Sequence, residues 1–173
     1  MRHISREHLL VSQLAEQFKV PSDELPERIN GVVSRLRAAE KEIAQLRTQQ
    51  VLASAGSLVD KASDVDGLKL VAESVDVGDA GALRALTSDV RARLGSVPGV
   101  VALFAEIDGK VSFVVATTES ARDKGIAAGK LIGTFASTVD GRGGGKPDLA
   151  QGGGADPSGV PAAIDALRAG LRA

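Results

Sequence analysis

The residues whose types and spacing are best suited to binding a ligand lie in a glycine-rich segment that covers residues 141–154. Glycine triplets at 143–145 and 152–154 bracket this segment, and Arg142 and Lys146 add positive charge. Consecutive glycines leave backbone N–H groups uncovered, so they can form a concave donor surface around a phosphate group. Glycine-rich composition alone favours a flexible surface loop, although such a loop rarely needs Pro-Asp-Leu-Ala-Gln between its triplets. The segment predicts a phosphate-facing loop, and the alternative is a flexible surface loop with no binding function.

The spacing around these glycines excludes the most familiar nucleotide-binding motifs. Asp140 stands where a nucleoside triphosphate P-loop requires its upstream glycine, and Pro147 stands where serine or threonine would meet magnesium. Lys146 takes the place of the third glycine of the dinucleotide-binding fingerprint. Neither motif is therefore present in this segment.

Side chains suited to catalysis or metal binding are scarce. The chain has no cysteine, which excludes disulfides, thiolate nucleophiles and cysteine zinc sites and is typical of a reducing compartment. Its only histidines, His3 and His8, have a spacing that is poor for a helix-borne metal site. Asp140 and Asp148 are a conceivable carboxylate pair, but both stand in turn-like settings where aspartate commonly caps backbone amides. We expect no catalytic residue, no metal and no cofactor in this chain.

Composition limits how the chain can bind nucleic acid. The formal net charge is −1, and residues 1–65 and 66–173 are each nearly neutral, so the chain has no broad basic field. Four phenylalanines supply all the aromatic content, so the stacking surfaces of the common RNA-binding sheets are unavailable. We find neither a targeting signal nor an apolar window that could span a bilayer, and therefore expect a cytoplasmic protein with no membrane partner.

The first part of the chain has the pattern of two helices. A stripe of Leu10, Leu14 and Phe18 predicts a short amphipathic helix, and the segment 20–23 breaks it. In the longer helix that follows, apolar residues recur at consecutive a and d positions with mostly charged flanks. This pattern predicts a coiled-coil arm that pairs with a second copy or, equally well, a helix that folds back on the first one. The seam residues of the dimer alternative are Ile29, Val32, Leu36, Ile43 and Leu46.

From Gly67 onward the pattern becomes that of an α/β domain. A strand-helix-strand step followed by a hairpin implies a mixed sheet packed against helices. We therefore expect a helical arm over residues 1–65 and a mixed-sheet α/β globular domain over residues 66–173. The expected elements of that domain are a strand at 68–77, a helix that Asp79 caps and Gly95 ends, strands at 100–107 and 111–116 joined by a turn at Asp108 and Gly109, a helix at 120–139, the glycine-rich loop, and a final helix at 157–171.

The run Gly-Gly-Gly-Lys-Pro-Asp-Leu-Ala-Gln-Gly-Gly-Gly resembles the C-terminal signature of bacterial alanyl-tRNA synthetases. Residues 127–132, Ala-Ala-Gly-Lys-Leu-Ile, resemble the helix that precedes that signature, and residues 9–46 look like the helical segment that follows the editing domain. The sequence departs from the family pattern at two positions. Asp140 stands ahead of Gly141-Arg142, where the family usually has glycines on both sides of a basic residue, and Lys146 stands before Pro147, where the family usually has arginine. Lysine offers a point charge in place of the guanidinium fork.

The resemblance implies a function in tRNA binding without catalysis. By this resemblance the chain is the C-terminal domain (C-Ala) of an alanine-tRNA ligase, and it grips the outer corner of an alanine-specific tRNA and links the aminoacylation and editing domains. The ATP, magnesium and zinc sites of the family belong to those other domains. The expected RNA-contacting residues are Lys124, Lys130, Arg142, Gly143, Gly144, Gly145 and Lys146.

Other readings stay open at this point. Lys124 and Lys130 can equally be solvated residues of a helix face. The chain can be a dimerisation module that acts through its arm. It can also be the substrate-binding accessory domain of a DHH-type phosphoesterase, a family that shares the same small fold by resemblance.

Overall fold

The computed structural model describes residues 2–172. Its internal contacts divide the chain into two compact units, and the boundary along the sequence falls between Leu46 and Arg47. The helix α2 (Leu25–Ala53) crosses this division. Neither unit holds a described helix with both the length and the apolar character that crossing a membrane requires.

The first unit contains α1 (Arg2–Phe18) and most of α2, as the apolar periodicity predicts. The break between the helices falls at Lys19, whose φ is +56°, and Pro21 follows. Leu10 and Leu36 are each 57% exposed, so the alternative in which the seam of α2 folds back on α1 is wrong.

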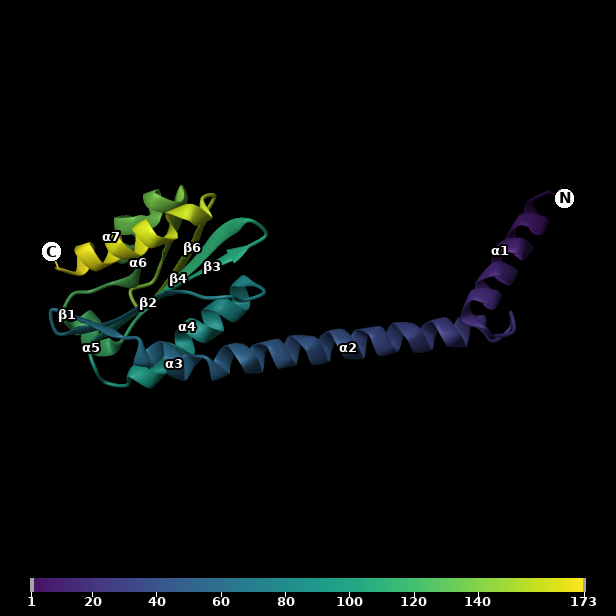
Figure 1. Ribbon diagram of the computed structural model, residues 1–173, viewed down its shortest axis with the longest axis horizontal. Coiled ribbons are helices and arrows are strands. Elements are labelled where there is room, and N and C mark those ends of the chain that lie inside the picture. Colours follow the sequence, from purple (N-terminus) through teal and green to yellow (C-terminus); the bar gives the residue numbers. More distant parts are fainter. Residues whose placement is uncertain (1, 173) are drawn as a thin grey trace. The chain divides into compact units, whose positions relative to one another are not determined.

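The second unit is built on a six-stranded mixed sheet in the order β1-β2-β3-β4-β6-β5 (Figure 1). Only β2 and β3 are parallel, and the other neighbouring pairs are antiparallel. This arrangement confirms the predicted mixed-sheet α/β fold. The strands are β1 (Ser63–Val65), β2 (Leu68–Ser74), β3 (Gly99–Ile107), β4 (Lys110–Thr117), β5 (Gly141–Gly145) and β6 (Leu149–Gly154). The helices are α3 (Ala55–Asp60), α4 (Ala80–Leu94), α5 (Glu119–Asp123), α6 (Ala128–Phe135) and α7 (Val160–Arg172), with 3-10 turns η1 (Ala136–Val139) and η2 (Pro157–Gly159).

Helices cover both faces of the sheet, α3 and α4 on one side and α6 and α7 on the other (Figure 1). Alternate residues of β3 enter the two cores: Phe104 packs under α6 and α7, whereas Leu103 packs under α4. Three of the four phenylalanines form one cluster in the α6/α7 core, with ring centroids 5.0 Å apart for Phe113 and Phe135 and 5.3 Å apart for Phe104 and Phe135.

Local signals located several elements correctly. The Asp79 side chain accepts a hydrogen bond from the Ala82 N–H at 2.8 Å and caps α4, as predicted. Asp108 and Gly109 both have positive φ, +53° and +73°, which fits the tight turn predicted between β3 and β4.

The single helix predicted over residues 120–139 is wrong, because the segment contains α5, α6 and η1. Gly125 has φ of +85°, a left-handed conformation that ends the first helical piece. Strand β1 was not predicted at all. The buried residues Ala55 and Leu58 pack in the α4 core, so the globular unit takes in residues that the sequence places in the arm.

Candidate nucleic-acid interface

The glycine-rich segment is a β-hairpin at the edge of the sheet, and the predicted loop is therefore wrong. Strands β5 and β6 pair antiparallel with Gly143 opposite Gly152, and β6 continues the sheet through β4. The segment is ordered because its backbone groups join the ladder of a sheet whose other strands are strongly apolar. Glycine composition alone carried no sign of this pairing.

On the α6/α7 face, the hairpin glycines make room for Phe113. A Cβ atom at Gly152 would lie 2.6 Å from Cζ of Phe113, and one at Gly143 would lie 3.0 Å from its Cε2 atom. Cβ atoms at Gly141 and Gly145 would lie 2.6 Å and 2.7 Å from the β6 backbone. These glycines are therefore required by packing within the chain, whatever the hairpin binds.

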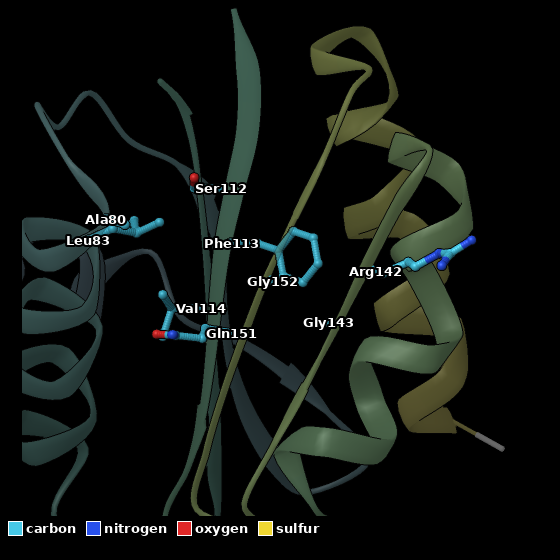
Figure 2. A pocket seen from close by; sticks show the side chains of 9 residues that line it. All are labelled: Ala80, Leu83, Ser112, Phe113, Val114, Arg142, Gly143, Gln151 and Gly152. Carbon is cyan, nitrogen blue, oxygen red and sulfur yellow. The ribbon is translucent and has the colours of Figure 1, made fainter. Parts of the chain in front are cut away.

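The opposite face of the hairpin, toward α4, is open. Gly144, Gln151 and Val114 share one row across β5, β6 and β4, and Arg142 shares a row with Ser112. A groove of about 520 Å³ runs beside α4 along these rows (Figure 2). Arg142 is among the residues that line this groove, and in Figure 2 its side chain extends away from Ser112 and Gln151.

The glycine amides do not form the predicted concave phosphate cradle. Hydrogen bonds at both ends of the hairpin, Ala155 N–H to Asp140 O at 3.3 Å and Lys146 N–H to Leu149 O at 3.0 Å, set the alternation of the ladder. This alternation directs the Gly144 N–H into the hairpin and the Gly143 N–H outward from the edge. An extended strand lacks the alternating conformations of an anion-binding nest.

The Pro-Asp turn of the hairpin is held from three elements. The Pro147 carbonyl accepts hydrogen bonds from the Thr117 Oγ1 hydroxyl on β4 at 2.7 Å and from the Ala128 N–H at the start of α6 at 2.9 Å. Arg91 of α4 donates to the Asp148 carbonyl at 3.1 Å, and its guanidinium lies 3.8 Å from the Asp148 carboxylate. Of these contacts, only the ion pair with Arg91 depends on a side chain of the turn, that of Asp148. Arg91 and Thr117 had no recognisable sequence signal.

The predicted cations do not form a single cluster. An added Cβ at Gly129 would lie 2.9 Å from the Gly145 carbonyl, so Lys130 and Lys146, the next residues along, flank the same junction of α6 and β5. Arg142 lies four residues from Lys146 along β5, which corresponds to about 13 Å. Lys124 is exposed at the end of α5. The structure thus places positive charge at both ends of the hairpin.

The same geometry separates the conceivable carboxylate pair. Asp140 precedes β5 and Asp148 lies in the turn at its other end, where Arg91 already neutralises it. Among the described residues, no group of three or more histidine, aspartate or glutamate side chains is arranged to hold a metal ion.

A family model described as the DHHA1 domain matches residues 67–173, which contain the sheet from β2 onward, the hairpin and α7. The chain belongs to the DHHA1 domain family. Its relatives include alanine-tRNA ligases. It is 66% identical over 172 residues to the alanine-tRNA ligase of Saccharopolyspora erythraea and 50% identical over 173 residues to that of Corynebacterium jeikeium. Each alignment covers 99% of this chain and 19% of the relative, so the chain spans about a fifth of the enzymes that it matches.

Solved structures agree with this DHHA1 assignment. The C-Ala domain of Aquifex aeolicus alanyl-tRNA synthetase superposes with a TM-score of 0.60 at 29% identity, over 65% of this chain and 99% of that one. A DHH-domain protein described as a member of a family of ribosomal proteins superposes with a TM-score of 0.55 at 12% identity, over 91% of this chain and 39% of that one. The second match shows a shared fold alone. The chain is therefore homologous to the C-terminal domain of alanine-tRNA ligases.

Proposed function

We propose that this chain is a non-catalytic tRNA-holding module of an alanine-tRNA ligase. In this proposal it grips the outer corner of the tRNA, links aminoacylation to editing, and works in the cytoplasm. The observation that carries the proposal is the exposed β5–β6 hairpin, which holds the family signature and has cations at both ends. Similarity to alanine-tRNA ligases along nearly the whole chain supports the choice of tRNA.

The chemistry of the parent enzyme is assigned to domains outside this chain. In this proposal the ATP, magnesium and zinc sites lie in those other domains, and this chain has no cysteine that could serve as a zinc ligand. Recognition without a broad basic field and without stacking aromatics has to rely on the shape of folded RNA. This is the kind of recognition that an outer tRNA corner requires.

The test is binding of the purified chain to folded tRNA, unfolded tRNA and a short single-stranded oligonucleotide over a salt series. We expect preference for folded tRNA. Replacing both lysines at the α6–β5 junction, Lys130→Gln and Lys146→Gln, should weaken binding and make the salt slope shallower by about one per lost phosphate contact. Lys69→Gln is the matched control, because Lys69 lies on β2 and pairs with Asp64 at 3.6 Å.

One outcome would argue against the tRNA proposal, and another would argue against the assigned lysines alone. Preference for the oligonucleotide would favour the accessory domain of a DHH-type phosphoesterase, the alternative that the shared fold supports. An unchanged salt slope in the double lysine variant would mean that these two lysines do not contact RNA phosphates.

A second proposed function is dimerisation through the arm. Leu36, Ile43 and Leu46 of α2 are 57%, 48% and 56% exposed, although they occupy a and d positions of a heptad seam. A row of apolar side chains this exposed is typical of a helix that pairs with another helix. The full set of seam positions is Ile29, Val32, Leu36, Ile43 and Leu46.

Sedimentation of the chain tests the dimer. The wild type should sediment as a dimer and the Leu36→Lys, Ile43→Lys variant as a monomer, because charge on the seam excludes a dry interface. Ala38→Lys, at a c position of the same helix, is the control and should leave the dimer intact. A monomeric wild type would contradict the dimerisation proposal while leaving tRNA binding open.

A further inference from the structure

We propose that one nucleotide of the bound RNA rests on the α4-side face of the β5–β6 hairpin, with its base flat against the backbone at Gly144 and its polar edge toward Gln151. This inference rests on the proposed tRNA-binding function. The sequence analysis predicted that a glycine-rich loop binds a phosphate. The present proposal is that the exposed backbone of a strand binds a base.

Gly144 has no reason within the described chain to be glycine. Apart from Gly144 and its two chain neighbours, no described residue has a heavy atom within 4 Å of a Cβ added there, and Gly144 sits in an extended strand with no positive φ. Glycine inside a strand weakens it, through backbone entropy and lack of side-chain packing, and often marks close approach of a ligand or another backbone. Its neighbours in β5 differ, because Gly143 and Gly145 both face close contacts from β6.

The groove is lined by Gly143 and Gln151, the chain neighbour and the cross-strand partner of Gly144, and it suits a base better than a phosphate. Its volume of about 520 Å³ lies in the range of small-ligand sites. Leu83 of α4 and Val114 of β4 contribute apolar walls, and the polar side chains of the lining are Ser112, Gln151 and Arg142. A strand face presents peptide planes, whereas the N–H donors that a phosphate needs lie in the plane of the sheet. Because the Arg142 side chain extends away from Ser112 and Gln151, the slot beside these two residues can accept a flat, largely apolar ring.

Gln151 and Arg142 complete the recognition. The exposed Gln151 carboxamide offers both a donor and an acceptor, so it can meet the edge of any base. The Arg142 side chain extends away from Ser112 and Gln151 (Figure 2), and its guanidinium is suited to pair with the phosphate of a neighbouring nucleotide. The site therefore recognises the position of a nucleotide in a folded RNA more than its sequence.

The decisive experiment compares Gly144→Val with Gly133→Ala in the full chain. A Cβ at either glycine would meet open space within the described residues, and neither glycine has positive φ, but Gly133 lies on α6. Folded-tRNA affinity at constant salt should fall about 10- to 100-fold for Gly144→Val, the range found for loss of one stacked base. Its melting temperature should not fall, because valine favours strands. Gly133→Ala should leave affinity unchanged.

Gln151→Ala provides a second variant, at an exposed position. It should weaken folded-tRNA binding several-fold, roughly the value of one neutral hydrogen bond, with an unchanged salt slope. Suppose that Gly144→Val and Gln151→Ala both keep wild-type affinity, while replacement of Lys130 and Lys146 weakens binding. This result would overturn the present inference but not the proposed function, and it would place the RNA along α6. Failure of the wild type to bind folded tRNA would instead overturn the proposed function.

Discussion

On the α6/α7 face of the hairpin, glycines at 143 and 152 leave space that the Phe113 ring fills, whereas on the α4 face Gly144 leaves space that nothing in the described chain fills. The two faces belong to the same strands and differ only in which side of the sheet a residue points to. A run of identical residues therefore has two origins. Packing within the chain explains one face, and we propose that an RNA partner explains the other.

The largest effect that separates the two faces is on stability. Gly152→Ala should lower the free energy of unfolding by about 3 kcal/mol, because its Cβ would overlap both Phe113 and the β5 backbone. Gly144→Ala, on the other face, should change it by no more than about 0.5 kcal/mol. Urea unfolding monitored by circular dichroism measures both values. Equal destabilisation would mean that the two faces do not differ.

A smaller effect is expected at the turn that joins the strands. Arg91→Gln removes the charged donor to the Asp148 carbonyl and should lower the free energy of unfolding by about 1.5 kcal/mol. Within the described part of the chain, the hydrogen bonds from β4 and α6 to Pro147 then remain. Arg84→Gln, on the same helix and exposed, is the control that should be neutral in the same unfolding assay. Stability unchanged by Arg91→Gln would show that the turn needs no contact from α4.

The part of the Gly152→Ala destabilisation that comes from overlap with the Phe113 ring can be measured as a coupling energy between positions 152 and 113. In a double-mutant cycle, Gly152→Ala should be less destabilising by about 1 kcal/mol when Phe113 is replaced by leucine. The smaller side chain relieves the overlap with the new Cβ, while the overlap with the β5 backbone remains. Strict additivity of the two changes would assign the need for glycine at 152 to the backbone alone.

The smallest expected effect concerns a glycine outside the hairpin. Gly133 lies within α6, is exposed, and no described atom would contact an added Cβ. Gly133→Ala should therefore raise the free energy of unfolding by about 0.8 kcal/mol through helix propensity. Thermal unfolding measures the gain. A loss of stability would indicate that α6 uses glycine for packing, as the hairpin does on its α6/α7 face.

Several elements were predictable because their signals are local. Asp79 ahead of α4 is an N-cap, and the pair Asp108 and Gly109 favours a tight turn whatever surrounds it. Heptad spacing along α2 was likewise readable from residues three and four apart. The helix predicted over 120–139 failed because apolar residues of α6 and η1 share a core without sharing one helix.

The sequence by itself determined the helices of the arm, the mixed α/β class and the segment that carries the signature, because capping, periodicity and turn residues act between near neighbours. Only the tertiary structure decided that this segment is an edge hairpin. It also decided that Arg91, 57 residues before Asp148, holds its turn, and that Gly144 faces solvent while Gly152 faces Phe113. Such facts depend on strand register and on packing between distant parts of the chain. A local pattern of glycines contains neither.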